Sequence, residues 1–513
     1  MEYDDVIVGG GSCGGVLAAR LSEDPARRVL LIDAGPDYAT LDLTPGDLTD
    51  GWRMSLHEHD WGLTAVAVPG RAIPYPRGRV IGGSSAVNAT IALRGVPADY
   101  DGWARLGNDA WGWADVLPYF RRLEDDAEGA ADVHGRGGPI PIRRWRLDEL
   151  IPTQRAFFEV CRRLGFSEVA DHNHPEASGV GPFPQNRRGR LRVSTAIAYL
   201  LPARRRPNLT IRPGCLVDRV LVEDGQAIGV EVESDGRRER VLGRRVTLAA
   251  GAIGSPAILM HSGIGRQAAL RDAGIEPLLD LPGVGAGLAD HPVTRLLLVP
   301  RAGSCDPQTP LAQVVLRYTA PGSDEFNDMQ QVIFSHVDVA GIGGQQAVAA
   351  VGAPWAIGLP VALEHPRGRG RLTVTSPDAH VPPVVELNFA HDPEDLRRLI
   401  EGVRLASQIA HEPEIARHVD HVALLTDGTM GDDEALAAYV RATVSTQFHP
   451  CGTARMGPPD CSTAVVDQQC RLRGVARLRV VDASVMPTIP RANINLTCIM
   501  IAERVSDWMR EGS

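Results

Sequence analysis

The sequence predicts an α/β protein built around a parallel, Rossmann-like sheet, and three observations near the N-terminus support this. Residues 4–8 form an apolar, β-branched run that is typical of a strand buried on both faces of a parallel sheet. The next residues, Gly9 to Gly14, fit G-x-G-x-x-G, and a helix is expected from Ser12 to Leu21. A second apolar run at 28–32 then ends at Asp33. Strand, glycine turn, helix, strand and acid in this order predict a dinucleotide site and leave NAD and FAD both open.

The size and charge of the chain exclude several classes of protein. At 513 residues it is too long for one compact core, so at least two domains are expected. The formal net charge of −10 disfavours nucleic acid and anionic membranes as partners, because both attract positive charge. No run reaches the roughly 18 apolar residues of a membrane span. The first strand also begins too early for a secretion signal, which predicts a cytoplasmic location.

The absence of lysine and the spacing of the cysteines exclude several kinds of catalytic and metal site. All 53 basic residues are arginine, so a phosphate-loop lysine, a Schiff-base lysine and a lysine base are excluded. The eight cysteines include no C-x-x-C pair, which argues against a disulfide framework or a zinc site. The Asp171 to His174 cluster fits no metal-ligand spacing. No metal site is therefore predicted.

A second glycine-rich segment follows a stretch with few regular features. Residues 41–75 contain several Pro and Gly residues and are expected to form a surface loop. Residues 76–88 then place Gly82, Gly83 and Ser84 ahead of a helical run that is expected to reach Arg94. Small residues allow backbone N–H groups to approach a flat or anionic ligand, and Asn88 offers an amide to its edge.

Periodicity predicts the remaining elements. Strands are expected within 209–250 and at 331–334, 355–363 and 370–375, and helices at 99–124, 151–164, 392–411 and 432–443. The segment from about 295 to 440 carries no dinucleotide signal.

Four separated motifs resemble signatures of the glucose–methanol–choline (GMC) family of flavin oxidoreductases. They are residues 76–88, Gly251 to Gly265, His449 to Gly457, and 478–503, in the family's order and spread over essentially the whole chain. The resemblance implies FAD as the cofactor. It also implies a discontinuous FAD-binding domain at 1–144, 205–295 and 441–513. An α+β substrate domain with an antiparallel sheet is expected at 145–204 and 296–440.

The resemblance also implies which residues bind the cofactor. Val217 is expected to present backbone groups to the adenine. Asp482 is expected to bond the ribityl or pyrophosphate side of the flavin through its peptide N–H. Some family members link the flavin to a histidine, and that position is Val87 here, so noncovalent FAD is predicted. The expected FAD-binding residues are Gly9, Gly11, Ser12, Cys13, Gly14, Asp33, Ala34, Arg79, Gly82, Gly83, Ser84, Asn88, Ala89, Val217, Ala250, Gly251, Asp482, Ala483, Asn493, Asn495 and Leu496.

His449 is the expected catalytic base. Oxidation of an alcohol removes a hydroxyl proton and a hydride, and a histidine with an ordinary pKa of about 6.5 can take the proton at neutral pH. The family's catalytic histidine falls at this position of the motif. Alignment on the run at 499–503 implies Asn495 as the second catalytic residue and Asn493 as its structural neighbour. The family's usual proline nearby is Thr497 in this chain.

Together, these features predict FAD-dependent oxidation of a primary alcohol to an aldehyde, with oxygen or another acceptor reoxidising the flavin. The 490–493 run and the unlinked flavin resemble aryl-alcohol and 5-hydroxymethylfurfural oxidases more than choline enzymes. Three alternatives stay open: a dehydrogenase of sugar, aminosugar or aliphatic alcohols, a hydroxynitrile-lyase-like FAD protein, and an NAD-dependent dehydrogenase. The alcohol, the acceptor and the oligomeric state do not follow from the sequence.

Overall fold

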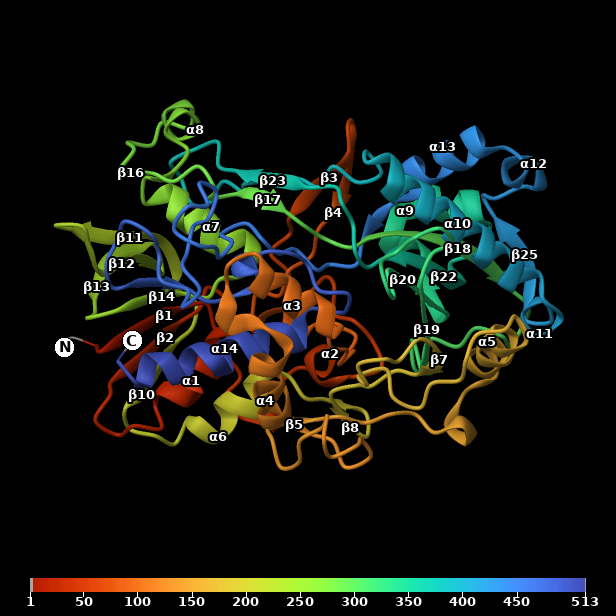
Figure 1. Ribbon diagram of the computed structural model, residues 1–513, viewed down its shortest axis with the longest axis horizontal. Coiled ribbons are helices and arrows are strands. Elements are labelled where there is room, and N and C mark those ends of the chain that lie inside the picture. Colours follow the sequence, from red (N-terminus) through yellow and green to blue (C-terminus); the bar gives the residue numbers. More distant parts are fainter. Residues whose placement is uncertain (1–2, 513) are drawn as a thin grey trace.

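An open parallel sheet lies near both chain termini (Figure 1). The computed structural model describes residues 3–512, without the side chains of 342–344, 346 and 427. All neighbouring strands of this sheet run parallel. In spatial order they are β10 (Leu209–Arg212), β2 (Val29–Ile32), β1 (Asp5–Val8), β14 (Val246–Leu248) and β27 (Leu478–Val480). The predicted Rossmann-like sheet is therefore confirmed, and its strands come from three separate parts of the chain.

Helix α1 (Gly14–Leu21) packs against the C-terminal helix α14 (Asn495–Arg510) beside this sheet (Figure 1). All four residues of β1 and of β2 are buried, as expected for strands covered on both faces. The helix begins at Gly14 rather than at Ser12, because the glycine turn uses the preceding residues and Gly9 adopts a φ of +97°. A three-stranded antiparallel sheet follows β10, with strands β11 (Leu216–Glu223), β12 (Gln226–Ser234) and β13 (Arg237–Leu242).

The other half of the molecule contains an eight-stranded antiparallel sheet, which confirms the α+β region (Figure 1). Six strands form its path: β25 (Val419–Ala423), β18 (Pro292–Pro300), β22 (Trp355–Leu363), β20 (Met329–Val332), β19 (Val314–Tyr318) and β7 (Gly179–Pro182). Strand β21 (Phe334–Asp338) pairs with β22, and β26 (Ser445–Thr446) pairs with β18. Helix α10 (Pro393–His411) covers β22 and β18, and α13 (Asp433–Thr443) packs on α10.

A third sheet corrects the prediction for residues 41–75. Its strands are β17 (Ala286–Leu288), β23 (Gly370–Thr373), β24 (Val384–Glu386), β3 (Thr64–Val68) and β4 (Arg71–Pro74). The expected loop thus contains a β-hairpin that turns at Gly70 with a φ of +81°, together with the short helix α2 (Gly46–Thr49). The hairpin is stabilised by pairing with β24, which lies some 300 residues later in the chain, so local composition could not reveal it.

The helical run expected up to Arg94 is wrong. Only a 3₁₀ turn at Gly83–Ala86 forms, and the chain then continues without regular structure, with Thr90 at a φ of +61°. Gly82 and Gly83 adopt left-handed conformations because this segment lies against the first glycine turn, where the Gly82 N–H donates to the Gly10 carbonyl at 2.8 Å. Ile91 pairs instead with Gln185. Glycines that allow two backbone segments to pack closely do not provide the apolar face that stabilises a helix.

The other predicted helices are confirmed with small shifts at their ends. They are α3 (Pro97–Arg105), α4 (Trp113–Leu123), α5 (Pro152–Arg163), α10 and α13. Further short helices are α6 (Leu201–Ala203), α7 (Gly251–His261), α8 (Gln267–Asp272), α9 (Val339–Val351), α11 (Pro413–Ala416) and α12 (Asp427–Met430). Two-residue strands are β5 (Glu124–Asp125), β6 (Ile140–Pro141), β8 (Arg187–Arg188), β9 (Leu191–Arg192), β15 (Ile264–Gly265) and β16 (Leu279–Asp280).

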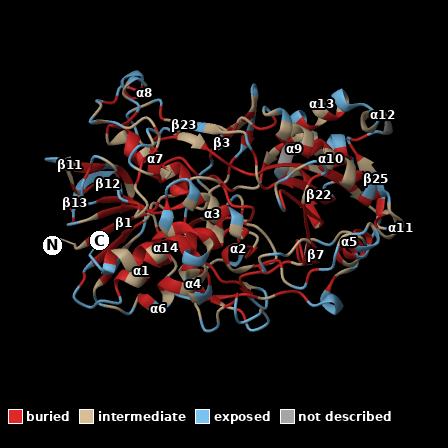
Figure 2. Cartoon of the chain, viewed as in Figure 1, coloured by how far each residue is buried: buried red, intermediate tan, exposed pale blue. Residues whose placement is uncertain are grey.

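Burial follows the two main sheets. Figure 2 shows buried residues concentrated around β1, along α14 and in the antiparallel sheet around β22, while α8 carries several exposed residues. Within residues 3–512, no helix has the length and apolar character needed to cross a bilayer. The domain boundaries given above stay a prediction, and β23 and β24 of the expected substrate domain share a sheet with β3, β4 and β17.

Candidate active site

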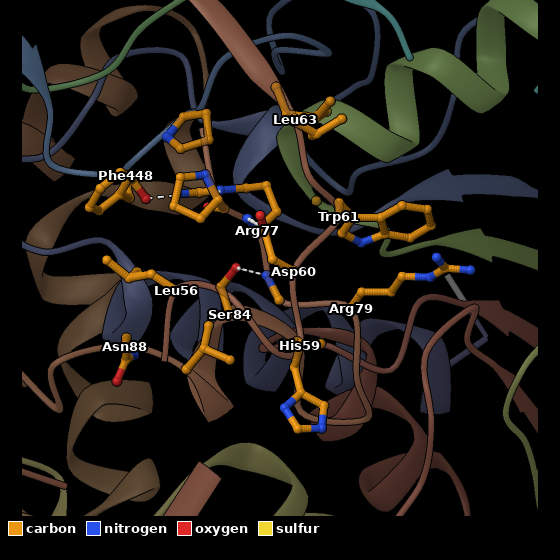
Figure 3. A pocket seen from close by; sticks show the side chains of 18 of the residues that line it. Leu56, His59, Asp60, Trp61, Leu63, Arg77, Arg79, Ser84, Asn88 and Phe448 are labelled. Atoms are coloured by element: carbon orange, nitrogen blue, oxygen red, sulfur yellow. Dashed lines mark hydrogen bonds between the residues drawn. The ribbon is translucent and has the colours of Figure 1, made fainter. Parts of the chain in front are cut away.

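The glycine turn after β1 and the His449 loop line the same cavity, which has a volume of about 760 Å³. Figure 3 shows part of its wall, including Trp61, Arg77 and Phe448. Nearly all of the predicted cofactor residues line the cavity, although they come from segments spread over the whole chain. The residues of the prediction that line the cavity are Gly9, Gly11, Ser12, Cys13, Asp33, Ala34, Arg79, Gly83, Ser84, Asn88, Ala89, Val217, Ala250, Gly251, Asp482, Ala483, Asn493 and Asn495. His449 lines it as well. Gly14, Gly82 and Leu496 are not among its lining residues.

Gly14 and Gly83 allow close packing of the backbone around the dinucleotide loop. A Cβ atom on Gly14 would lie 1.8 Å from the carbonyl oxygen of Gly9, so no side chain fits there. A Cβ atom on Gly83 would lie 2.7 Å from the Cα atom of Gly11. The two glycine segments therefore pack backbone against backbone, which brings Gly11 and Gly83 into the cavity wall together.

Asp33, at the end of β2, lies where the fingerprint predicts an acid for the ribose. Its Oδ2 accepts the Gly10 N–H and its Oδ1 accepts the Gly35 N–H, both at 2.7 Å. Burial raises the pKa of Asp33 to about 6, against the opposing effect of these two donors. Each oxygen keeps a second lone pair, and Asp33 lines the cavity, so the carboxylate can still accept from ribose hydroxyls.

The cavity wall fits a long, partly flat ligand such as FAD. Gly251 has a φ of +80° at the start of α7, and a Cβ atom there would meet nothing within 4 Å, so the backbone stands open to the cavity. The Asp482 carboxylate accepts the Gly251 N–H at 2.9 Å and the Ser255 hydroxyl at 2.5 Å, which fixes the ends of β27 and α7 next to each other. The expected contact of the Asp482 peptide N–H with the flavin stays a prediction.

Aromatic and arginine side chains form a further part of the cavity wall (Figure 3). The Arg79 guanidinium lies over the Trp61 ring, 4.9 Å from its centroid. Arg77 donates to the Phe448 carbonyl at 2.8 Å. Asn88 lines the cavity, but its side-chain oxygen already accepts a hydrogen bond from the Thr90 N–H at 2.9 Å.

His449 is held by a chain of hydrogen bonds that fixes its proton. The Nδ1 atoms of His449 and His291 are 2.9 Å apart, and His291 Nε2 lies 3.1 Å from the Pro490 carbonyl oxygen. A carbonyl can only accept, so His291 carries its proton on Nε2 and its Nδ1 accepts from His449. Neutral His449 therefore has its proton on Nδ1 and its lone pair on Nε2, where it accepts from the Asn493 amide at 3.2 Å.

The protonation state of His449 suits a base. It is 9% exposed and lines the cavity. Burial, then the neighbouring His291 and Arg77, hold its pKa well below the ordinary value of 6.5. Burial also lowers the pKa of His291 to about 4. Both imidazoles are thus neutral at pH 7, and the Nε2 lone pair of His449 can accept a proton.

The asparagine next to this lone pair is Asn493, not Asn495. The Asn493 Nδ2 lies 3.2 Å from His449 Nε2, and its Oδ1 has no partner among residues 3–512. Asn495 opens α14, and its Oδ1 accepts the Ser12 hydroxyl at 2.9 Å. The structure thus reverses the positions expected from the alignment, because Asn495 already belongs to the helix while Asn493 is still in the loop that faces His449. Thr497, in place of the family's proline, bonds Tyr100 at 2.9 Å.

Three residues that support His449 were not predicted from the sequence: Asp290, His291 and Glu364. Asp290 accepts the backbone N–H groups of His449 and His291 at 2.9 and 2.7 Å, and the hydroxyls of Tyr75 and Thr446 at 2.6 Å each. The adjacent pair Asp290-His291, in a loop after a glycine-rich turn, was the available signal.

The third residue, Glu364, had no sequence signal. It is fully buried at the end of β22, with an oxygen 3.7 Å from His291 Nδ1, and neither carboxylate oxygen has a hydrogen-bond partner in the described part of the chain. Burial raises its pKa to about 7.

Two clusters elsewhere bring acids and a histidine close enough to hold a metal ion. They are Asp47, Glu58 and His59, and Glu124, Asp126 and His134. In the second, Arg94 and Arg144 already pair with the carboxylates, and Asp171 bonds His134 at 2.7 Å. Asp171 thus contributes to an ion-pair network, and the absence of a metal site stays a prediction.

Comparisons with known proteins agree with this architecture. Models of the GMC oxidoreductase family match residues 3–293 and 366–502. An oxygen-dependent choline dehydrogenase from Rhizobium etli is 34% identical, over 99% of this chain and 95% of that protein. The crystal structure of pyridoxine 4-oxidase from Mesorbium loti has a TM-score of 0.90 and 33% identity, covering 99% of both chains.

A fungal aryl-alcohol oxidase shares the fold, with a TM-score of 0.83, 23% identity and coverage of 100% of this chain and 99% of that one. Its low identity supports the fold alone, so the expected preference for aryl-alcohol over choline relatives stays a prediction. The family matches span most of the chain and contain both the glycine turn and His449. The protein is an oxidoreductase and belongs to the GMC family.

Proposed function

We propose that the protein oxidises a primary alcohol to an aldehyde with noncovalently bound FAD in the cytoplasm, using His449 as the base. The observation that supports this most is the hydrogen-bond chain from Pro490 through His291 to His449, which places the Nε2 lone pair, rather than a proton, beside Asn493 at the cavity wall. Bound FAD would supply the hydride acceptor. The residues that would hold it are the lining residues around the glycine turn, Asp33, Val217 and Gly251.

His449 and Asn493 would act together on the alcohol. The Nε2 atom of His449 takes the hydroxyl proton as the carbonyl forms and the hydride leaves for the acceptor, and it later releases the proton to solvent. The Asn493 amide, 3.2 Å from that nitrogen, can donate to the substrate oxygen and hold it near the base. Asn493 therefore replaces Asn495 as the second catalytic residue, and Asn495 keeps a place beside Ser12 at the start of α14.

Valine at position 87 supports an unlinked flavin. Val87 lines the cavity, and its side chain offers no nucleophile for a covalent bond. Flavin that stays with the polypeptide after denaturation would contradict this part of the proposal.

The experiment is anaerobic mixing of the purified yellow protein with a panel of alcohols, followed by air. Bleaching of the flavin by an alcohol supports the proposal. Fast recovery in air with peroxide formation identifies oxygen as the acceptor, and recovery only with a dye or quinone identifies a dehydrogenase. Flavin that no alcohol bleaches, together with cyanohydrin cleavage, would favour a lyase instead. Protein purified without flavin that reduces NAD would support the nicotinamide alternative.

A further inference from the structure

One face of the antiparallel sheet forms the substrate-side wall of the cavity. Residues on four strands of this sheet line it, and they alternate along β18, β20 and β21, as expected for side chains that share one face of a sheet. The lining residues of this face are Val293 and Arg295 on β18, Pro360 on β22, Gln330 and Val332 on β20, and Phe334 and His336 on β21. Most of this wall is apolar or neutral, and Arg295 is its single arginine.

Arg295 differs from the other arginines at the cavity. Arg53 Nε lies 3.6 Å from Asp50 Oδ2. Arg77 donates to the Phe448 carbonyl, and the Arg79 guanidinium lies over the Trp61 ring. The Arg295 guanidinium, by contrast, makes no hydrogen bond, ion pair or ring contact with any described residue, and burial lowers its pKa. A partly buried cation without a partner is costly, because the protein replaces none of the hydration that it loses.

The acids that line the cavity do not neutralise Arg295. Asp33 and Asp482 hold the glycine turn and α7 in the other half of the molecule. Asp60 accepts the Arg77 backbone N–H at 2.6 Å. Asp338 lies on the same sheet, but it pairs with Trp355 whereas Arg295 pairs with Pro360, which separates them by about 17 Å along β22. Asp338 also caps helix α9 through the Gly341 N–H.

Arg295 is placed to reach a substrate bound at His449. His291, Val293 and Arg295 alternate along the same strand, and pairing of β18 with β26 brings His291 to His449. Arg295 is thus four residues, or about 13 Å, along the strand from His291. Its strand, β18, belongs to the antiparallel sheet, whereas the glycine turn, where the FAD phosphates are expected, follows β1 of the parallel sheet in the other half of the molecule (Figure 1). The phosphates therefore do not account for its charge.

We propose that Arg295 binds a carboxylate on the substrate, and that the protein therefore oxidises alcohols that carry a carboxylate several bonds from the hydroxymethyl carbon. This inference rests on the proposed alcohol oxidation. A guanidinium donates two parallel hydrogen bonds to a carboxylate, and the apolar side chains of Val293, Val332 and Phe334 would surround the carbon skeleton between the two ends. A cationic alcohol such as choline would place like charges together.

The test compares each carboxylate with its neutral carboxamide. The alcohols are 3- and 4-(hydroxymethyl)benzoate and 4-hydroxybutanoate, each paired with the corresponding amide, and the measurement is kcat/KM for anaerobic flavin reduction. At least one carboxylate is expected to exceed its amide by about 10- to 100-fold. Arg295→Gln should reduce this preference to about threefold or less while it leaves the amide within about threefold.

Two further variants separate charge from position. Arg295→Lys keeps a cation at the site and should retain part of the preference. Arg301→Gln removes an exposed arginine just beyond the end of β18, and should retain all of it. No carboxylate preferred over its amide in the wild type, or an equal loss for both members of a pair in Arg295→Gln, would overturn the inference.

A binding measurement keeps the inference separate from the proposed function. The probe is 4-methylbenzoate, which has no hydroxyl to oxidise, and its binding is followed by the change in flavin absorbance. The dissociation constant should rise about tenfold or more in Arg295→Gln and stay unchanged in Arg301→Gln. If no alcohol reduces the flavin, the proposed function fails while this titration still decides the role of Arg295. Equal dissociation constants in all three proteins, or no binding to any, would contradict it.

Discussion

The two walls of the cavity are built in different ways. The dinucleotide wall is made of backbone: Gly9, Gly11 and Gly14 follow one another within six residues, and Gly9 and Gly14 leave no room for a side chain. The substrate wall is made of side chains from β18, β20 and β22, which lie up to about 70 residues apart in the chain. Backbone geometry at the first wall constrains residue type strictly, whereas the second wall can change its side chains without loss of the sheet.

The largest expected effect comes from breaking the backbone wall. In Gly14→Ala the new Cβ atom would lie 1.8 Å from the Gly9 carbonyl oxygen, so the glycine turn must move. We expect little or no flavin in the purified protein, measured as flavin absorbance per polypeptide. Gly46→Ala is the matched control, because a Cβ atom there meets nothing within 4 Å. A Gly14→Ala protein with full flavin content would show that this wall tolerates side chains after all.

On the substrate side, His449→Ala should abolish chemistry without loss of the cofactor. Removing a general base costs typically about 10²- to 10⁴-fold in rate, and flavin content should be unchanged. The measurement is stopped-flow flavin reduction by the best alcohol. Because burial holds the pKa of His449 well below 6.5, the wild-type rate should also stay flat between pH 8 and 6.5. A variant within threefold of the wild type would remove His449 from the mechanism.

A smaller effect distinguishes the two asparagines. Asn493→Ala should lower the rate of flavin reduction by about tenfold, the cost of one hydrogen bond to the reacting oxygen. Asn495→Ala removes the partner of Ser12, next to the glycine turn, and should weaken flavin retention more than the reduction rate. Both quantities are measured on both variants. The opposite pattern would restore Asn495 as the catalytic partner of His449.

The smallest effect concerns Glu364 and appears as a pH dependence of stability. Its pKa rises from the ordinary value of 4.5 to about 7 on folding. The stability that the protonated carboxyl contributes is thus complete below pH 4.5 and is lost as the pH rises toward 7, by up to about 3 kcal/mol. Glu364→Gln should therefore lose less thermal stability than the wild type between pH 5 and 8. Parallel Tm profiles for the two proteins would indicate that Glu364 is ionised in the folded state.

The difference between the walls also explains which expectations succeeded. The parallel sheet and its glycine turn were predicted because strand, turn and acid lie within 30 residues. The hairpin at Thr64–Pro74 was missed because it pairs with β24, and the helix expected toward Arg94 was wrong because Gly82 and Gly83 pack on the glycine turn instead. In both places, contacts with a distant segment decided the local structure.

For this protein, the sequence by itself determined the dinucleotide fingerprint, the family resemblance and the histidine loop, because each depends on residue types at fixed short spacings. Only the tertiary structure decided that Asn493 rather than Asn495 contacts His449, and that His291 sets the position of its proton. It also decided that Arg295, at the substrate wall, has no counterion among the described residues. These facts depend on which side chains meet across strands and loops that are far apart in the chain. The spacing of residues along a sequence does not specify such side-chain contacts until the pairing of the strands is known.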